Sequence, residues 1–230
     1  MKKFIFVSLF LVFAGLPAGL MAQDGHTSVI IGTGVSDSYN GAPFNVYYRN
    51  STAEMIYPAS QIGMSGWIDT LWFYSASSSP FPCTSLNVYL GTTSAESFTS
   101  TTSWIFVGQL DPVFHGGTVS IGGATGWYAI PLDAPWYYMD SENLVVAVTK
   151  TAGDYSTSSL WRSTTAASNQ VLYRQDDDIA GYGDIYSLTA TTQGTCSAGL
   201  PNLKISFNTS MEAPTCFRPG RLVFSGITSH

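Results

Sequence analysis

The sequence predicts an all-β protein, a two-sheet antiparallel β-sandwich with a jelly-roll-like arrangement. Short apolar runs are divided throughout by Gly, Ser, Thr, Asn and Pro, the residues that turns favour. Several of these runs alternate apolar and polar residues with the period of two that a half-buried strand requires. No long segment carries an apolar period of 3.6 residues together with helix caps. About ten short strands exceed the seven of a minimal immunoglobulin domain.

Apolar runs in the first part of the chain predict three strands and a turn. The strands are expected at Ser28–Gly32, Asn45–Arg49 and Glu54–Tyr57. A single helical turn is expected at Ala59–Ile62. The apolar residues that follow are Ile68, Leu71 and Phe73, and they share one buried face only if a bulge near Asp69–Thr70 resets the register.

Alternation also defines the later strands. Leu203–Phe207 is the clearest, and Leu86–Leu90 shows the same period. Leu144–Val148 is apolar on both faces, which is typical of a central strand covered on each side. Further strands are expected at Trp104–Gly108, Thr118–Ile121, Trp127–Leu132, Ser159–Arg162 and Gln170–Arg174.

The N-terminus has the layout of a secretory signal peptide. Lys2 and Lys3 precede an apolar run, Phe4–Leu20, which Pro17 interrupts, and the small residue Ala22 follows. The run is too short for a membrane-spanning helix, which needs about 20 apolar residues, and no cysteine follows it to receive a lipid. We expect residues 1–22 to be cleaved after Ala22 and residues 23–210 to form one β-sandwich domain. The mature chain is then secreted, extracellular or on the cell surface, without insertion into a membrane.

Charge and composition limit the partners of the chain. The formal net charge is −6, with 9 Lys and Arg against 15 Asp and Glu, and loss of Lys2 and Lys3 with the signal peptide lowers it to −8. Binding to nucleic acid or to an anionic membrane requires clustered lysine and arginine, which this sequence lacks. No nucleic-acid partner is expected. A hydrophobic content of 45% with 10% charged residues favours a packed core over disorder.

The chain has three cysteines, Cys83, Cys196 and Cys216. Export permits disulfides, and three cysteines allow one bridge with one thiol left over. The sequence does not choose the pair. No CxxC motif or Cys/His cluster is present, which argues against a zinc site.

The last 20 residues differ from the rest of the chain. Met211–Cys216 has the composition of a linker, and Leu222–Thr228 is one short apolar strand that cannot bury its side chains without partner strands. We therefore expect a further β domain to follow residue 230. Ala213–Pro219 together with Leu222–Thr228 resembles the opening strand of a fibronectin type III module. Residues 211–230 are accordingly expected to be a linker and the truncated start of such a domain.

Short motifs spread through the main domain carry a second resemblance. They are Tyr39–Tyr48, Glu54–Tyr57, Ile62–Gly63, Gly66–Ile68, Val88–Gly91, Val113–Gly116, Leu132–Trp136 and Glu142–Val148. Together they resemble the N-terminal β-sandwich of large type IX-secreted bacterial surface proteins, which is similar to the cleaved-adhesin domains of gingipain-like haemagglutinins and commonly precedes fibronectin type III modules. The resemblance implies an adhesion or interaction role with a host or cell-surface protein or glycan, and it implies no particular ligand. The sorting domain of that class is absent from these residues.

An acidic loop is the candidate metal site. Asp176, Asp178 and Asp184 lie in one segment with Gly181 and Gly183, and calcium takes about six to eight oxygen ligands in flexible geometry. The sandwich domains that the chain resembles sometimes carry calcium in their loops. The EF-hand spacing is not met, and adjacent aspartates of an extended chain cannot all point inward. A solvated acidic loop is therefore the alternative to a calcium site.

Exposed aromatic side chains are candidates for glycan binding, because sandwich modules often stack sugar rings on them. Trp136 and Trp161 lie close to predicted loops and are the candidate platform. Trp67, Trp72 and Trp127 lie inside predicted strands. We expect these three in the core, since aromatic residues are favoured in strands and in sandwich cores.

Catalytic motifs are missing from the sequence. The GxSxG, HExxH, P-loop and Rossmann spacings are all absent. His115 is the one candidate base, and the glycines that follow it favour a loop histidine instead. The sequence thus predicts a non-catalytic adhesion or interaction module and no enzyme. The alternatives are a carbohydrate-binding module attached to an enzyme encoded beyond residue 230, and a secreted hydrolase, which would require His115 beside a serine and a buried carboxylate.

Overall fold

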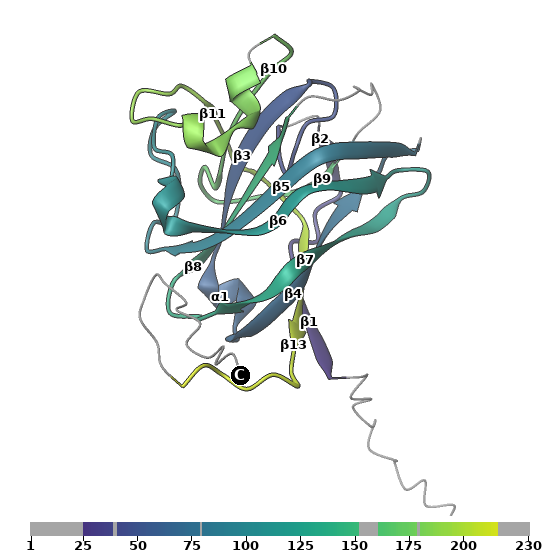
Figure 1. The fold of residues 1–230 in the computed structure, drawn as a ribbon, viewed down its shortest axis with the longest axis vertical. Helices are drawn as coiled ribbons and strands as arrows, with labels where there is room; N and C mark the ends of the chain where they lie inside the picture. The colour runs from purple at the N-terminus through teal and green to yellow at the C-terminus, as the bar shows by residue number, and fades with distance from the viewer. Residues whose placement is uncertain (1–24, 39–40, 79, 152–160, 179, 216–230) are drawn as a thin grey trace, which may run out of the picture.

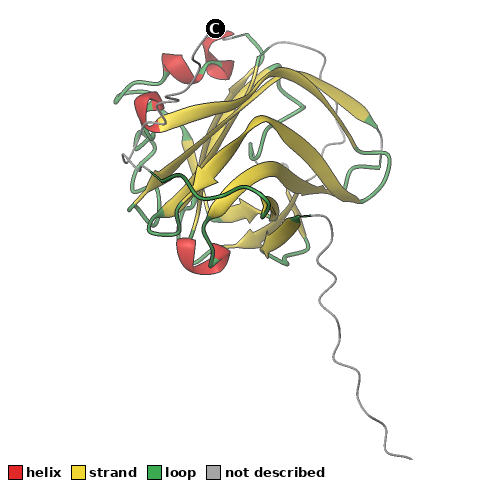
Figure 2. Cartoon of the chain, turned by 60° about the horizontal axis from the view of Figure 1, so that its bottom comes forward, coloured by secondary structure: helices red, strands yellow, loops and turns green. Residues whose placement is uncertain are grey.

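The computed structural model describes residues 25–38, 41–78, 80–151, 161–178 and 180–215. Two antiparallel β-sheets pack face to face (Figures 1 and 2). The predicted all-β sandwich is therefore confirmed. The expected signal peptide, residues 1–22, and the expected strand at 222–228 lie outside the described residues.

The larger sheet, sheet A, has seven strands and contains both ends of the domain. Its order is β1 (His26–Ile31), β13 (Leu203–Asn208), β4 (Gly66–Ser75), β9 (Trp161–Thr165) and β12 (Gly199–Pro201), with β2 (Ser36–Ser38) paired to β9 and β7 (Gly126–Tyr138) paired to β4. The first and last strands are neighbours. His26 lies opposite Asn208 in the register, and the Thr209 N–H donates to the Gly25 carbonyl at 2.7 Å. The chain therefore enters and leaves this sheet at the same corner (Figure 1).

The smaller sheet, sheet B, has six strands. Their order is β11 (Thr195–Ser197), β10 (Val171–Asp176), β3 (Asn50–Tyr57), β8 (Asn143–Lys150), β5 (Phe81–Thr93) and β6 (Leu110–Ile121). The chain passes repeatedly from one sheet to the other, so most neighbours within a sheet are distant in sequence. This crossing pattern gives the sandwich its jelly-roll-like character.

Helices are confined to short turns in the described part of the chain. They are α1 (Ala59–Ile62) and the 3-10 turns η1 (Val107–Gln109), η2 (Ala180–Gly183) and η3 (Ile185–Ser187). α1 confirms the predicted helical turn, which ends at Gly63 in the left-handed conformation (φ +67°) with its N–H donating to the Ala59 carbonyl at 2.9 Å. None of the helices in the described residues is long and apolar enough to cross a membrane.

A bulge in β4 decides which of its side chains face the core. The register against β7 shifts between Ile68 and Thr70, as predicted. Ile68, Leu71 and Phe73 are consequently all buried on the inner face of sheet A. The residues between them, Trp72 among them, project from the outer face.

The central part of sheet B is buried on both of its faces, while β6 at its edge is exposed on the outer side. Its inner face contributes to the main core between the sheets, and its outer face is covered by the segments around residues 98–110 and 185–196. Residues on this covered outer face include Ile56, Val145, Ala147 and Leu172, which pack against Trp104 and Ile105. All of Leu144–Val148 is buried, which confirms the prediction that this strand is covered on each side.

Two predicted strands are wrong. Asn45–Arg49 is a series of bends, because its backbone groups bond to side chains and not to a neighbouring strand. Lys150 Nζ donates to the carbonyls of Tyr48 and Arg49 at 2.9 Å each, and the Tyr47 N–H donates to Asn45 Oδ1 at 2.7 Å. Trp104–Gly108 is a loop ending in η1. Its residues Trp104, Ile105 and Val107 pack on the outer face of sheet B, while Phe106 is exposed.

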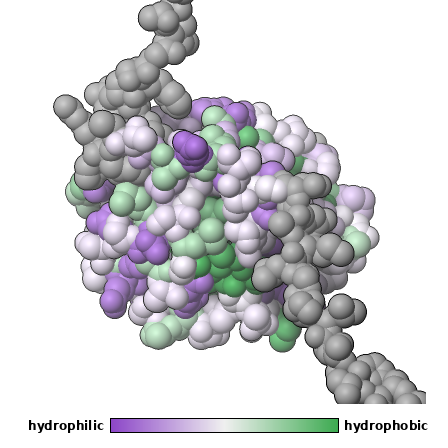
Figure 3. Space-filling model, turned by 90° about the horizontal axis from the view of Figure 1, so that it is seen from below, coloured by the Kyte–Doolittle hydropathy of each residue, from purple (hydrophilic) through white to green (hydrophobic). Residues whose placement is uncertain are grey.

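The surface carries few charges. Viewed from below, pale and scattered purple residues surround one apolar area (Figure 3). This side of the molecule therefore presents no continuous charged surface.

Candidate functional site

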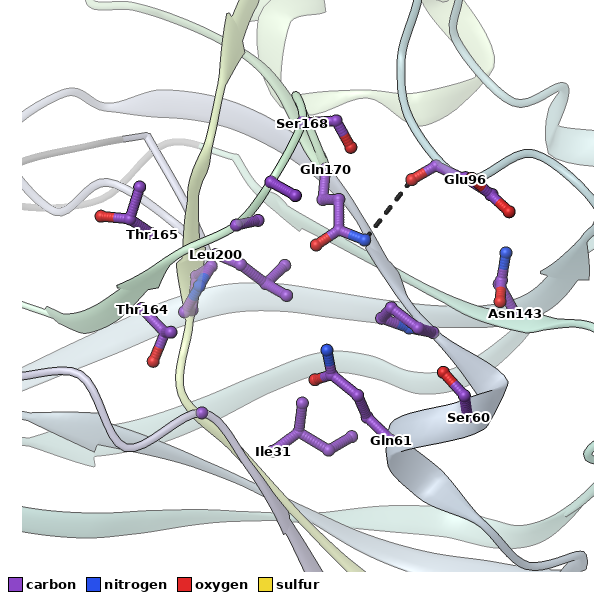
Figure 4. Close-up of a pocket in the computed structure, with 15 residues that line it drawn as sticks. Ile31, Ser60, Gln61, Glu96, Asn143, Thr164, Thr165, Ser168, Gln170 and Leu200 are labelled. Atoms are coloured by element: carbon purple, nitrogen blue, oxygen red, sulfur yellow. Dashed lines mark hydrogen bonds between the residues drawn. The ribbon is translucent and has the colours of Figure 1, made fainter.

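A cavity of about 410 Å³ opens at one end of the sandwich, between the two sheets. Figure 4 shows the residues that line it. Sheet A supplies residues from the ends of β1, β9 and β12, and sheet B supplies residues next to β3, β5, β8 and β10. α1 adds Ser60 and Gln61. We refer to this cavity as the end cleft.

Neutral hydrogen-bonding groups dominate the lining of the end cleft. The amides and hydroxyls are those of Gln61, Asn143, Gln170, Ser60, Thr164, Thr165 and Ser168. Ile31, Leu200 and Pro201 add an apolar part to the wall. Among the described residues that line the cleft, Glu96 is the one with an ionisable side chain.

Hydrogen bonds fix the amides on the sheet B side. Asn143 Oδ1 accepts from the Ala59 N–H at 3.0 Å, and its Nδ2 donates to the Ala95 carbonyl at 2.9 Å. Gln170 Nε2 donates to the backbone carbonyl of Glu96 at 3.4 Å. The backbone carbonyl of Gln170 accepts from the Ile56 N–H at 2.9 Å. Asn143 and Gln170 thus hold the cleft wall in place and anchor the loop around residue 96 through its backbone carbonyls.

The sheet A side of the cleft is fixed through Thr164. Its Oγ1 accepts from the Gly34 N–H at 2.7 Å and donates to Asn202 Oδ1 at 2.8 Å, while Asn202 Nδ2 donates to the Gly34 carbonyl at 2.8 Å. Gly34 allows this close approach, because a Cβ there would lie 2.1 Å from the Ser163 carbonyl oxygen. Hydrogen bonds thus fix both walls of the cleft, and the cleft is preformed.

Gln61 differs from these wall residues because its side chain is exposed. It reaches into the cavity from the opposite side to Gln170 (Figure 4). A ligand in the cleft would meet this amide before the fixed ones.

The predicted aromatic platform is not on the surface. Trp161 is 2% exposed and lies in the main core, with Nε1 donating to the Phe44 carbonyl at 2.9 Å. Trp136 is 9% exposed, and its Nε1 donates to Asp111 Oδ2 at 2.9 Å. Both occupy inward positions of their strands, β9 and β7, so neither is available to stack on a sugar.

The tryptophans expected in the core lie on the outer face of sheet A instead. Trp67, Trp72 and Trp127 are each half-buried. The predicted bulge in β4 already implied this for Trp67 and Trp72, because inward Ile68, Leu71 and Phe73 leave the residues beside them facing outward. The strand period around the bulge is thus the sequence signal for the outward position of these two rings.

The acidic loop shows no gathered set of metal ligands. Among the residues that the structure describes, no three His, Cys, Asp or Glu side chains gather so as to hold a metal ion. Asp176 Oδ1 accepts from the Asp178 N–H at 2.7 Å, and Asp184 caps η3 by accepting from the Tyr186 N–H at 2.9 Å. The carboxylates of Asp176 and Asp184 are thus each oriented by their own local turn.

A buried arginine organises the same loop. Arg174 is 8% exposed, and its Nη2 donates to the carbonyls of Gly181 (2.6 Å) and Asp184 (3.2 Å) and to Ser187 Oγ. Its Cζ also lies 4.7 Å from the centre of the Tyr182 ring. Carbonyls that could have completed a calcium site therefore face a guanidinium, whose positive charge repels a cation.

His115 pairs with a carboxylate on the surface. Its Nδ1 lies 2.8 Å from Asp133 Oδ2, and the two side chains are 58% and 50% exposed. No hydrogen bond joins His115 to a serine within the described residues. The pair lacks both the serine and the buried carboxylate that a hydrolase triad requires.

Two of the three cysteines are free thiols, and the third, Cys216, lies outside the described residues. Cys83 is fully buried in the main core, and this burial raises the pKa of its thiol to about 12, against a smaller lowering by Lys150. Cys196 is half-buried, and burial raises the pKa of its thiol as well.

Comparison with known proteins finds no matching family model, curated protein or solved structure. The functional assignment therefore depends on the geometry of the cleft and the surface.

Proposed function

We propose that this chain is a non-catalytic extracellular interaction module whose contact site is the end cleft. The extracellular part of the proposal rests on the predicted signal peptide at residues 1–22. The binding part rests on one observation: a preformed cavity of about 410 Å³ lined mainly by neutral amides and hydroxyls.

The chemistry of the lining favours binding over turnover. General acid–base catalysis needs two groups that hold and release protons at the reacting atoms. In the described lining Glu96 is the one such group, and its side chain is exposed. Amides and hydroxyls, by contrast, suit recognition by hydrogen bonding.

A glycan is the ligand class that this lining favours over a protein. Sugars present hydroxyls that both donate and accept, which matches amides such as those of Gln61 and Gln170. Their C–H faces suit the apolar part of the wall formed by Ile31 and Leu200. A carbohydrate-binding module is therefore the second candidate, as a finer form of the first.

A glycan array with the mature protein tests this assignment. Gln61→Ala is expected to weaken the strongest neutral glycan about fivefold, the value of one hydrogen bond. Gln109→Ala is the matched control, because Gln109 is an exposed glutamine on η1 outside the cleft. Equal effects of the two substitutions, or no glycan bound at all, would remove the cleft as the glycan site.

The hydrolase alternative has its own test. His115→Ala is expected to leave any hydrolysis of ester, peptide and glycoside substrates at the level of the wild-type protein. A substantial hydrolysis that this substitution abolishes would contradict the non-catalytic assignment.

A further inference from the structure

The described chain leaves the outer face of sheet A largely open. The outer face of sheet B is covered over β3, β8 and β10 and exposed along β6, and the inner faces of the two sheets form the main core. On the outer face, Trp72 and Tyr74 of β4 lie beside Trp127 of β7 and Lys204 of β13. We call these four residues the aromatic face.

Contacts within the aromatic face hold its rings in fixed positions. Trp72 Nε1 donates to Ser206 Oγ at 3.0 Å. Tyr74 and Trp127 meet edge to face with ring centres 5.1 Å apart. Lys204 Nζ lies 3.8 Å from the centre of the Trp72 ring and 5.8 Å from that of Trp127. The three rings and the ammonium group thus form one ordered patch.

The positive charge of this patch is unusual for the chain. Only five lysines and arginines fall within the described residues, and two of them, Lys150 and Arg174, are buried. Lys204 and Arg162 both lie on the outer face of sheet A, the latter with Cζ 5.0 Å from the centre of the Tyr74 ring. Asp37 of β2 lies opposite Arg162 in the register, so Lys204 is the cation of this face without a carboxylate opposite it in the register.

Lys204 makes no salt bridge with a carboxylate of the described residues. Asp69 is the carboxylate nearest in sequence to Trp67 and Trp72. Its Oδ2 lies 2.6 Å from His26 Nε2. In a chain of formal charge −6, an ammonium held between two tryptophans and left without a carboxylate is complementary to an anionic partner.

We propose that the aromatic face binds an acidic polysaccharide, a chain of uronic acid units, at a site separate from the end cleft. Trp127 offers an electron-rich ring to the polarised C–H groups of a sugar. Lys204, whose ammonium group lies over the Trp72 ring, receives the sugar carboxylate. Residues two apart on a strand point to the same face of the sheet, so Trp72 and Tyr74 lie in a row along β4 beside Trp127. An extended glycan chain can follow such a row.

The linker after β13 sets one limit to this site. Trp67 Nε1 donates to the Glu212 carbonyl at 2.7 Å, so the chain after β13 contacts the Trp67 end of β4. The polysaccharide therefore lies over the Trp72 end of the strand, next to β13 and β7.

The test is binding of the mature protein to polygalacturonate, measured by affinity electrophoresis and calorimetry at low and at physiological salt. Lys204→Gln and Trp127→Ala are each expected to weaken binding at least tenfold. Raising the salt concentration is expected to weaken the binding of polygalacturonate by the wild-type protein. Arg49→Gln removes the same charge from an exposed arginine elsewhere and is expected to change binding less than twofold. Trp127→Phe keeps a ring and is expected to retain most of the affinity.

Four results would overturn the proposal. They are no binding of polygalacturonate, equal losses in Lys204→Gln and Arg49→Gln, equal binding of poly-glutamate, and self-association that Lys204→Gln abolishes. Gln61→Ala in the end cleft is expected to leave polygalacturonate binding unchanged. Failure of the cleft and failure of the aromatic face are thereby separated.

Discussion

The carboxyl group of Glu54 accepts a hydrogen bond of 2.8 Å from the backbone N–H of Ile105 beneath the loop that covers sheet B. Glu54 is fully buried, and its second oxygen, Oε1, has no hydrogen-bond partner among the described residues. Burial raises the pKa of this carboxyl to about 8, with a smaller lowering by the Ile105 N–H. At neutral pH the group is therefore protonated, which removes the cost of a buried charge.

The raised pKa of Glu54 makes stability depend on pH. Because the folded protein keeps a proton that the unfolded chain loses near its ordinary value of 4.5, the free energy of unfolding falls as pH rises from about 4.5 to 8. Glu54→Gln removes this dependence. The difference in the free energy of unfolding between the wild-type protein and Glu54→Gln is expected to change by about 4 kcal/mol between pH 5 and pH 8. Denaturant titrations at each pH measure it. A difference that stays constant with pH would show that Glu54 is charged in the folded state.

Trp161 and Trp127 are predicted to differ sharply in their contributions to stability. Trp161→Ala removes a core ring that packs edge-on against Phe44 and Phe73, and is expected to lower the free energy of unfolding by about 3 to 5 kcal/mol. Trp127→Ala, on the open face, is expected to lower it by about 1 kcal/mol or less. Chemical unfolding of both variants measures this. Similar losses in both would mean that the outer face is covered in solution.

The two described thiols are predicted to react at different rates. The thiolate is the reactive form, so buried Cys83, with a thiol pKa of about 12, is expected to resist alkylation in the native protein. Half-buried Cys196 is expected to react first. Mass spectrometry after timed labelling of the Cys216→Ser variant distinguishes them. Labelling of Cys83 at the rate of Cys196 would contradict the packing of β5.

Calcium is predicted to have no effect on stability. Addition of calcium or of a chelator is expected to leave the melting temperature unchanged, since a ligand that binds the folded state alone would raise it. Arg174→Gln is the positive control for the loop, and is expected to cost about 2 to 3 kcal/mol because carbonyls of Gly181 and Asp184 lose a charged donor. A melting temperature that falls with chelator would restore the calcium hypothesis.

Strand patterning predicted most of the fold correctly. Leu203–Phe207 and Leu144–Val148 lie in strands with the expected burial, and the bulge after Ile68 is present. Leu86–Leu90 also lies in a strand, but Tyr89 is buried because the outer face of sheet B is covered there. These features were accessible because period-two alternation and two-sided apolarity report directly on which faces a strand buries.

The failures have a common physical cause. Asn45–Arg49 and Trp104–Gly108 have strand-like composition, yet their backbone partners are side chains remote in sequence, such as Lys150 and Glu54. Trp161 was misplaced because its polar neighbours resemble a loop, although Ser163 is a small residue facing the same core. The end cleft was not predicted at all, since it is assembled from six separate segments by the sandwich topology.

The adjacency of β1 and β13 has a mechanical consequence. Because residues 25 and 209 meet at one corner, tension applied between these two points would not shear the six residue pairs that join the strands. It would peel β1 away one rung at a time, starting at His26 and Asn208, and each step opposes the pull with only a few hydrogen bonds. A module built this way yields at low force from its first strand, while the remainder of the sandwich stays folded.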